Sequence, residues 1–338
     1  MTATHDTKPR ALLVADRAAC EAVFGDGIFA ALASQLRLVA PLLDAGQLRR
    51  DPGVLREVEI IVGTWGMPPL DETLLAHAPR LRAVFLAAGS VKNVATAAFW
   101  QRNLVIVSAF QMNAIPVAEF ALGEILFSLK HGWRYALGMR DRRQYLPKAA
   151  AMPGAFRSTV GLIALGAIGR RVAELLQNFQ VNVVACDPYC PAPVAARLQV
   201  TLLPLGDLFA RADVVSIHAP ALPETQGLIR ASHLNALRAG ATIINTARGA
   251  VIDEKELVEV LARRPDLTAV LDVTEPMPPL PDSPLFGLPN VVLTPHIAGA
   301  QDRECLRLGR FIAAEVERYL RGEALQGVIT EEMATRMA

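Results

Sequence analysis

The sequence predicts an α/β protein built from two doubly wound parallel-sheet domains. A chain of 338 residues, 52% of them hydrophobic, is long enough to bury the cores of two domains. Short β-branched apolar runs alternate with longer amphipathic stretches, which is the pattern of βα units that pack helices on both faces of a parallel sheet. The apolar runs also fall into two series, separated by a long helical segment, and this separation indicates one sheet per domain.

Ten apolar runs are predicted to form strands. Each is short and almost continuously apolar, as expected for strands that are buried on both faces of a sheet. The first series comprises residues 11–15, 59–64, 83–88 and 104–108. The second series comprises residues 159–165, 182–187, 213–218, 241–247, 268–273 and 291–294.

Three further segments complete the predicted order of elements. Residues 116–140 predict one long helix, because Pro116 suits a first helical turn and apolar residues then recur at helical spacing. Residues 144–157 contain two prolines and a glycine and predict a surface connection. A last helix is expected over residues 302–322.

Composition argues against several classes of partner. Lys and Arg total 34 against 33 acidic residues, so the net charge of +1 gives no strong field that would attract nucleic acid or an anionic membrane. Charges interrupt every apolar run before the roughly 20 residues that span a bilayer, and residues 1–10 are polar. The four cysteines form no CxxC pair or Cys/His cluster. We therefore expect a cytoplasmic protein with no metal, membrane or nucleic-acid partner.

The segment TVGLIALGAIG, residues 159–169, joins a predicted strand to a predicted helix through a glycine-bearing turn. This is the Rossmann context, in which a dinucleotide pyrophosphate rests on a helix N-terminus. Gly166 and Gly169 hold the second and third positions of the GxGxxG fingerprint, with Ala167 and Ile168 between them. Ala164 stands at the first position, where its Cβ is costly if the turn needs a positive φ.

Asp187 closes the next predicted strand, about 20 residues after the fingerprint. A carboxylate at that place accepts hydrogen bonds from the ribose hydroxyls of the adenosine and repels a 2′-phosphate. The cofactor is therefore predicted to be NAD rather than NADP.

Three later stretches identify a family. They read NTARGAVID from Asn245, LDVTEP from Leu271 and LPNVVLTPHIAG from Leu288. With the fingerprint, they resemble the D-isomer-specific 2-hydroxyacid dehydrogenases, which include glycerate, phosphoglycerate, lactate and glyoxylate/hydroxypyruvate enzymes. The resemblance is densest from Val160 to Ala300 and fainter in the first 80 residues.

The resemblance implies a particular domain organisation. A Rossmann NAD-binding domain, residues 112–299, would be inserted into a flavodoxin-like substrate domain formed by residues 1–111 and 300–338. It also implies a homodimer, in which the long helix after Pro116 packs against its copy.

Chemistry gives independent reasons for two of the matched residues. Oxidation of a 2-hydroxy acid needs a cation for the carboxylate, a base for the hydroxyl proton and a nicotinamide for the hydride. Arg248, just beyond a strand end, matches the family's arginine, whose planar fork can hold a carboxylate bidentately. His296, after Thr294 and Pro295, resembles the family's acid/base. We therefore expect Arg248 and His296 to be the catalytic pair acting on a small 2-hydroxy or 2-keto acid.

Other site residues follow from the resemblance or from their places at strand ends. The turn Ala88, Gly89 and Ser90 resembles the loop that binds the substrate carboxylate through backbone N–H groups. His218 is given a structural role. The remaining residues expected to line the cofactor are Ala219, Pro220, Thr225, Thr246, Ala247, Asp272 and Gly299.

One position departs from the family pattern. The family places a Glu five residues after the Asp of LDV, where it holds the catalytic His, whereas this chain has Met277 there. Methionine makes no strong hydrogen bond to an imidazole, and Glu275, the nearest substitute, lies in a proline-stiffened loop. The leading hypothesis is an NAD(H)-dependent oxidoreductase. The alternatives are an inactive sensor of NAD(H) and 2-keto acids, and a formate- or phosphite-type dehydrogenase.

Overall fold

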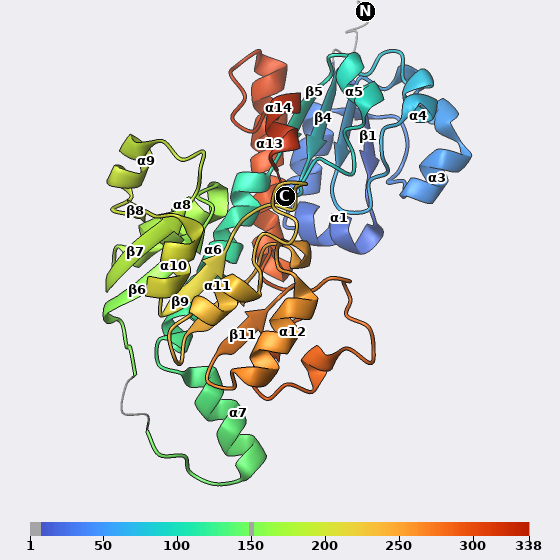
Figure 1. The fold of residues 1–338 in the computed structure, drawn as a ribbon. Helices are drawn as coiled ribbons and strands as arrows, with labels where there is room; N and C mark the ends of the chain where they lie inside the picture. Colours follow the sequence, from blue (N-terminus) through green and yellow to red (C-terminus); the bar gives the residue numbers. More distant parts are fainter. Residues whose placement is uncertain (1–7, 149–151, 338) are drawn as a thin grey trace, which may run out of the picture. The chain divides into compact units, whose positions relative to one another are not determined.

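The computed structural model describes residues 8–148 and 152–337, which divide into two compact units (Figure 1). Unit 1 contains residues 8–113 and 300–337, and unit 2 contains the described residues between 114 and 299. Residues 149–151, part of the expected surface connection, and most of the polar N-terminus lie outside the described residues. Each unit has its own parallel sheet.

The sheet of unit 1 has five strands in the order β2-β1-β3-β4-β5. This is the order of flavodoxin-like doubly wound sheets. All its pairings are parallel, and Leu12 of β1, for example, lies opposite Ile61 of β3. The strands are β1 (Arg10–Val14), β2 (Arg37–Leu38), β3 (Ile60–Gly63), β4 (Ala83–Leu86) and β5 (Val105–Ser108).

Helices cover both faces of this sheet. Alternate strand residues point to opposite faces, so Leu13 and Val107 pack under α1, α2 and α13, whereas Leu12 and Ile106 pack under α3, α4, α5 and α14. These helices are α1 (Arg17–Phe24), α2 (Ile28–Gln35), α3 (Ala45–Arg50), α4 (Glu72–Ala76), α5 (Ala97–Gln101), α13 (Cys305–Arg321) and α14 (Glu331–Thr335).

The sheet of unit 2 has seven parallel strands in the order β12-β11-β10-β9-β6-β7-β8. Counted from β6, this is the Rossmann order with one added edge strand, and the strand order reverses between β6 and β9. The strands are β6 (Phe156–Ile163), β7 (Gln180–Cys186), β8 (Thr201–Leu202), β9 (Val214–Ile217), β10 (Thr242–Asn245), β11 (Thr268–Leu271) and β12 (Val291–Leu293).

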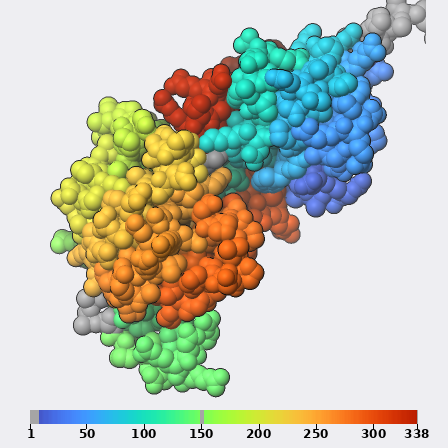
Figure 2. Space-filling model, turned by 45° about the vertical axis from the view of Figure 1, so that its right-hand side comes forward, coloured from blue at the N-terminus to red at the C-terminus, as the bar shows by residue number. Residues whose placement is uncertain are grey.

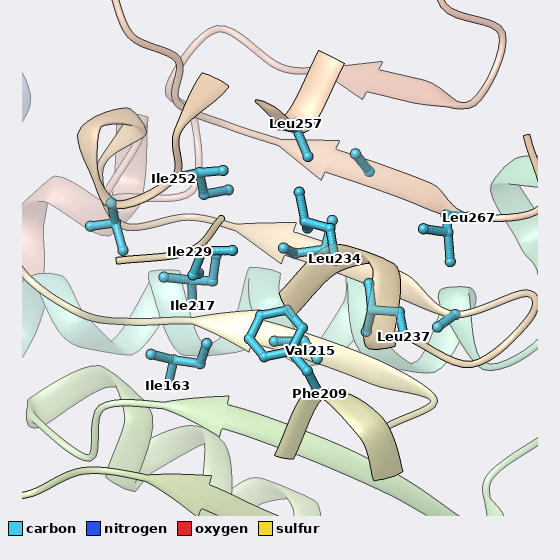
Figure 3. Packing of buried hydrophobic residues seen from close by; sticks show 14 of the residues in the cluster. Ile163, Phe209, Val215, Ile217, Ile229, Leu234, Leu237, Ile252, Leu257 and Leu267 are labelled. Atoms are coloured by element: carbon cyan, nitrogen blue, oxygen red, sulfur yellow. The ribbon is translucent and has the colours of Figure 1, made fainter. Parts of the chain in front are cut away.

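Unit 2 is also a three-layer sandwich. One face carries α10, α11 and α12, whose Phe209, Leu234 and Leu257 pack with Val215 and Ile217 of β9 (Figure 3). The other face carries α6, α8 and α9. The helices are α6 (Phe110–Ser128), which starts at the end of unit 1, α7 (Gly132–Arg142), α8 (Ala167–Leu176), α9 (Ala192–Arg197), α10 (Leu205–Arg211), α11 (Ala231–Ala236) and α12 (Glu254–Arg263).

The fold class is confirmed, and each of the ten expected runs overlaps a strand. The two-residue strands β2 and β8 were not predicted, because so short an element has no measurable apolar period. The helix expected over residues 302–322 is confirmed in α13, which is capped by Gly322 in the left-handed conformation with a φ of +68°. It is not the last helix, because the short α14, which was not predicted, follows it.

The prediction of one helix over residues 116–140 is wrong. The helix begins earlier, at Phe110, and it ends at Ser128; α7 then starts at Gly132 after a bend of 65°. His131 adopts a φ of +52° at the bend, and a Cβ on Gly132 would lie 2.5 Å from the ring of Phe127. The bent pair α6 and α7 passes the length and hydropathy test for a membrane span, and no single helix among the described residues does so.

Candidate functional site

The expected cofactor residues gather at the carboxyl edge of the seven-stranded sheet. β6 and β9 are adjacent there, and their chains leave in opposite directions, which forms the crevice where doubly wound sheets bind ligands. Ala164 follows β6 directly, Asp187 follows β7 and Ala219 lies two residues beyond β9. Asn245 ends β10, and Asp272 and Thr294 follow β11 and β12 directly.

In the glycine-bearing turn after β6, the backbone of one residue is strained. Ala164 has a φ of +70°, so the first fingerprint position does need the left-handed conformation that favours glycine. At Gly169 a Cβ would lie 2.1 Å from the carbonyl oxygen of Ala164, so only glycine fits. Gly166 precedes α8, and no side chain caps the helix. The first N–H groups of α8, which include those of Ala167 and Ile168, are therefore available to an anion.

Asp187 is tied to the same turn. Its carboxylate accepts hydrogen bonds from the backbone N–H of Leu165, at 2.6 Å, and of Tyr189, at 2.8 Å. Each carboxylate oxygen can accept more than one hydrogen bond, so both keep capacity for a ribose hydroxyl. The half-buried carboxylate thus braces the fingerprint turn from the end of the neighbouring strand.

His218 lies underneath the turn. Its Cδ2 atom is 3.6 Å from the position that a Cβ on Gly169 would take, and within the described part of the chain neither ring nitrogen has a hydrogen-bond partner. Burial lowers the pKa of His218 to about 4, so the ring is neutral at pH 7. Its packing against the turn fits the structural role expected from the sequence.

Asn245 shapes the turn that carries Arg248. Its Nδ2 donates to the carbonyl of Arg248 at 2.9 Å, and its Oδ1 accepts from the N–H of Ala247 at 3.0 Å. The sequence reasoning assigned Asn245 no role, although a buried polar residue at a strand end is itself a signal.

Arg248 itself is half-buried, and its guanidinium donates to the carbonyl of Ala247 at 2.6 Å. No carboxylate of residues 8–148 or 152–337 forms an ion pair with it. Burial lowers the pKa of Arg248, because the charged form loses hydration without gaining a counter-ion. A half-buried guanidinium in this state is suited to an anionic ligand.

Two other cofactor candidates differ in how their hydroxyls are used. The Thr246 hydroxyl is buried and has no partner among the described residues, so it is available to a ligand. The Thr225 hydroxyl donates to the carbonyl of Pro220 at 2.5 Å and accepts from the N–H of Leu222 at 2.8 Å. The Thr225 side chain therefore stabilises the loop that follows the buried Ala219.

Asp272 organises the segment that carries His296. Its Oδ1 accepts from the Thr294 hydroxyl at 2.6 Å and from the N–H of Ile297 at 2.8 Å, and its Oδ2 accepts from the N–H of Ala298 at 2.9 Å. Asp272 is buried, whereas His296 is exposed with a φ of +56°. The Asp272 carboxylate thus holds the backbone on both sides of the histidine, a function that the sequence did not reveal.

A pocket of about 440 Å³ opens beside His296. Met277 and Phe286 supply much of its apolar wall, and Asp272 and Thr274 lie among its polar residues. Glu275, considered above as a substitute partner for the histidine, does not line the pocket, and its N–H donates to Glu254 at 2.8 Å. Met277 and His296 therefore line the same pocket.

The expected carboxylate-binding turn lies in unit 1, immediately after β4. The Ser108 hydroxyl donates to the carbonyls of Ala88, at 2.9 Å, and Gly89, at 3.0 Å, so both carbonyls face the core. Within the described chain the N–H groups of Gly89 and Ser90 donate to no acceptor. A Cβ on Gly89 would lie 3.1 Å from the Nδ2 of Asn113. Gly299, the last of the expected residues, ends unit 2.

No group of three or more His, Cys, Asp or Glu side chains arranged to hold a metal ion occurs in the part of the chain that the structure describes. The site is therefore built from a helix N-terminus, single polar side chains and one guanidinium.

Known proteins resemble the chain in sequence and in fold. Residues 123–298 match the NAD binding domain of D-isomer specific 2-hydroxyacid dehydrogenases. D-3-phosphoglycerate dehydrogenase of Mycobacterium bovis is 37% identical over 276 residues, which cover 78% of this chain and 51% of that protein. The chain thus spans about half the length of the curated relatives that it matches.

Solved structures extend the likeness to both units. The TT0316 protein of Thermus thermophilus superposes with a TM-score of 0.73 at 27% identity, over 95% of this chain and 100% of that one. The apo D-mandelate dehydrogenase of Rhodotorula graminis shares the fold, with a TM-score of 0.78 at 22% identity over 96% and 98% of the two chains. The match over unit 2 makes NAD the cofactor of this domain. The chain belongs to the D-isomer specific 2-hydroxyacid dehydrogenase family.

Proposed function

We propose that the protein is an NAD(H)-dependent oxidoreductase that interconverts a small 2-hydroxy acid and its 2-keto acid. The observation that carries this proposal is Arg248, a half-buried guanidinium at the carboxyl edge of the NAD-binding sheet that has no carboxylate partner among the described residues. A bound 2-keto acid would supply the missing anion.

The proposed mechanism divides the work among three groups. Arg248 binds the substrate carboxylate and polarises the C2 oxygen. His296 accepts the hydroxyl proton during oxidation and returns it during reduction. The nicotinamide, when bound, accepts or donates the hydride at the C2 carbon.

The residues of unit 2 fit the cofactor. The uncapped N-terminus of α8 would hold the pyrophosphate, and Asp187 the adenosine ribose. The unpartnered hydroxyl of Thr246 and the end of β11 at Asp272 would lie beside the nicotinamide. Because Asp272 already accepts three hydrogen bonds, we assign it chiefly to holding the His296 segment.

The test is NADH oxidation by the purified protein with glyoxylate, pyruvate, hydroxypyruvate, phenylpyruvate and oxaloacetate between pH 5 and 8. We expect turnover of at least one 2-keto acid, rising toward acid pH, and its loss in His296→Ala. Arg248→Lys keeps the charge but not the fork, so it should raise KM more than it lowers NADH affinity. Absence of turnover with every acid, despite NADH binding, would contradict the proposal.

A second candidate function is an NAD(H)- and 2-keto-acid-binding sensor without useful turnover. Met277 favours it, because this thioether lines the His296 pocket where the family pattern has a carboxylate. The variant Met277→Glu discriminates between the two functions. If His296 lacks only its partner, the glutamate should raise turnover at pH 7 to 8 by about tenfold or more.

Met277→Gln is the matched control, because it adds hydrogen bonding of similar size without a negative charge. An increase confined to the glutamate variant supports stabilisation of the protonated ring. If both variants stay inactive while NADH still binds, the sensor function is favoured.

We further propose that the protein is a homodimer, as the family resemblance implies. The exposed ring of Phe127 near the end of α6, and α7, which has no buried residue, leave apolar surface on this part of unit 2. Sedimentation equilibrium tests the proposal. The cytoplasmic location stays a prediction from composition.

A further inference from the structure

All residues of the described chain that line the pocket of about 440 Å³ beside His296 belong to unit 2. Most of its wall is apolar and comes from the connection between β11 and β12 and from the end of β12. The apolar side chains that face it include Met277, Pro278, Pro279, Phe286 and Leu293. The connection belongs to the orange surface of unit 2 in Figure 2, and both Met277 and Phe286 are exposed. A molecule in the pocket therefore meets mainly carbon and sulfur atoms.

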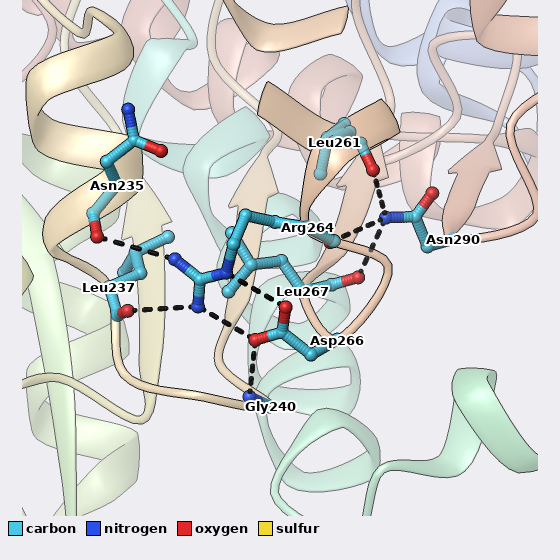
Figure 4. Close-up of polar contacts among 8 residues, drawn as sticks. All are labelled: Asn235, Leu237, Gly240, Leu261, Arg264, Asp266, Leu267 and Asn290. Atoms are coloured by element: carbon cyan, nitrogen blue, oxygen red, sulfur yellow. Dashed lines mark hydrogen bonds and ion pairs between the residues drawn. The ribbon is translucent and has the colours of Figure 1, made fainter. Parts of the chain in front are cut away.

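The two strands that lead into the pocket are joined at both ends. At their amino ends, Asn290 precedes β12 directly, and its Nδ2 donates at 3.1 Å to the carbonyl of Leu267, directly before β11 (Figure 4). At their carboxyl ends, the Thr294 hydroxyl donates to the Asp272 carboxylate at 2.6 Å. These two side-chain contacts hold the strand ends together, so the pocket is preformed, which lowers the entropic cost of binding.

Among the described side chains that line the pocket, His296 has the one hydrogen-bond donor that is not already used. The Thr274 hydroxyl donates to the carbonyl of Pro276 at 2.7 Å, and the Thr294 hydroxyl donates to Asp272. The imidazole of His296, in contrast, forms no hydrogen bond or ion pair within residues 8–148 and 152–337. A ligand of this pocket therefore needs an apolar body and one acceptor group that reaches the imidazole.

A carboxylate is the acceptor group that fits His296 best. In the proposed reaction the imidazole carries a proton and a positive charge before reduction, and a carboxylate stabilises this form through a charge-assisted hydrogen bond. No lysine or arginine of the described chain lines the pocket, so the further charges of a polyanion would find no partner there. Asp272 also lines the pocket, but three donors already satisfy its carboxylate, so it weakens the binding of a second carboxylate without preventing it. The lining therefore favours a monoanion with an apolar body.

We propose that the pocket beside His296 binds a monocarboxylic acid with an apolar body, whose carboxylate accepts a hydrogen bond from the imidazole. The bound acid acts as an activator, because it orients the ring and stabilises its protonated form. It is separate from the substrate, whose carboxylate is assigned to Arg248. Its apolar body packs against Met277 and Phe286, and a volume of about 440 Å³ lies within the range of small-molecule sites. The activation rests on the proposed function, whereas the binding does not.

The binding experiment is an NMR titration of the full-length protein with butyrate at pH 7, in the absence of NADH. The ring nitrogens of His296 report the contact, and the variant His296→Gln assigns their signals. Butyramide is the matched probe, because it has the size of butyrate but no charge. We expect butyrate to shift the His296 signals toward those of the protonated ring, and butyramide to shift them far less. From acetate to butyrate, the Kd should fall by about threefold or more for each methylene that enters the pocket.

The variant Phe286→Ala removes part of the apolar wall and should raise the Kd for butyrate by about fivefold to tenfold. Leu280→Ala is the matched control, because Leu280 is about as exposed as Phe286 and lies in the same connection between strands but does not line the pocket. The control should change the Kd by less than about twofold. Equal affinities in the two variants, or binding of butyramide as tight as that of butyrate, would overturn the proposal.

Kinetics separate the activator from the substrate. With a 2-keto acid that the protein reduces, butyrate should raise kcat at pH 7 to 8 by about threefold to tenfold, and Met277→Glu, which supplies its own carboxylate, should remove this effect. A rise in KM without a rise in kcat would mean that butyrate competes at Arg248, and it would contradict the proposal. If no 2-keto acid is turned over but butyrate shifts the His296 signals, the proposed function fails and the binding site stands. If turnover occurs and butyrate changes neither the signals nor kcat, the site fails and the proposed function stands.

Discussion

Ala164 shows how much one methyl group can matter at the residue scale. From the sequence we predicted the fingerprint turn, and we expected its alanine to be costly only if φ is positive. The structure supplies that condition, with a φ of +70°. An L-residue in the left-handed region costs roughly 1–2 kcal/mol, and glycine avoids this cost. The chain therefore holds its dinucleotide turn against a local preference, through contacts such as the bond from Leu165 to Asp187.

The variant Ala164→Gly should be more stable than the native chain. Relief of the strained φ exceeds the extra flexibility of glycine in the unfolded state, so we expect a gain of about 0.5–1 kcal/mol. Thermal unfolding measures it as a rise in Tm of about 1–4 °C. Ala196→Gly, in helix α9, is the matched control and should lower the Tm instead. A fall in both variants would show that Ala164 makes contacts that outweigh the strain.

Thr246 gives a prediction that separates binding from stability. Its buried hydroxyl has no partner within the described chain, so Thr246→Val should leave the protein as stable as before, or up to about 1 kcal/mol more stable. If the hydroxyl contacts NADH as proposed, the Kd for NADH should rise by about tenfold.

The control for Thr246 is Thr274→Val. Thr274 is equally buried, but its hydroxyl donates to the carbonyl of Pro276 at 2.7 Å. Its replacement should therefore lower stability by about 1–2 kcal/mol. Unchanged NADH affinity in Thr246→Val would remove Thr246 from the cofactor site.

At the scale of elements, Asp272 links the end of β11 to the segment after β12. The five residues from Thr294 to Ala298, which include His296, form no regular structure, so the carboxylate bonds replace the contacts that a helix or strand would provide. Carboxylate acceptors make stronger hydrogen bonds to backbone N–H groups than neutral acceptors do.

The variant Asp272→Asn tests this role. An amide has one acceptor oxygen, so at least one of the N–H groups of Ile297 and Ala298 loses its partner, and we expect a loss of about 2–3 kcal/mol. The amide exchange rates of these two residues should rise by about tenfold or more. Thr294→Val removes one neutral donor and should have a smaller effect. Unchanged exchange in Asp272→Asn would show that the segment is held by other contacts.

The elements also show which features a sequence can predict. Strands such as β1 and β4 were located because burial on both faces gives four or more consecutive apolar residues. The break between α6 and α7 was missed because the apolar period continues through it, and the close approach of the Phe127 ring to Gly132 is visible only in the folded chain. In the site, the residues at strand ends and the glycines of the fingerprint were predicted from their spacing. The hydrogen bonds of the Asn245 and Asp272 side chains were not predicted, because they join loops that only the folded chain brings together.

At the scale of the whole molecule, the two units have separate cores and sheets. Two-state unfolding is therefore not expected, and calorimetry should resolve one transition for each unit. A substitution or a protonation within one core should change the Tm of that unit and leave the Tm of the other unit unchanged.

His218 allows this independence to be tested by pH. Its folded pKa of about 4 lies below the ordinary value of 6.5, so the unfolded chain binds the proton more tightly. The stability that the neutral ring contributes is complete above pH 6.5 and is lost as the pH falls toward 4. Between pH 7 and pH 4.5 the loss is about 2.5 kcal/mol, which corresponds to about 5–10 °C in Tm for a domain of this size.

The comparison is between the native chain and His218→Gln, which has no titrating ring at this position. Burial also lowers the pKa of His131, in the same unit, so His131 destabilises unit 2 at low pH as well. This effect is present in both proteins and cancels when their Tm values are compared. We expect the transition of unit 2 to fall by about 5–10 °C more in the native chain than in the variant between pH 7 and pH 4.5, and the transition of unit 1 to fall equally in both. Equal falls for unit 2 would mean that His218 finds a partner for its proton when the site opens, and a single merged transition would mean that the two cores unfold together.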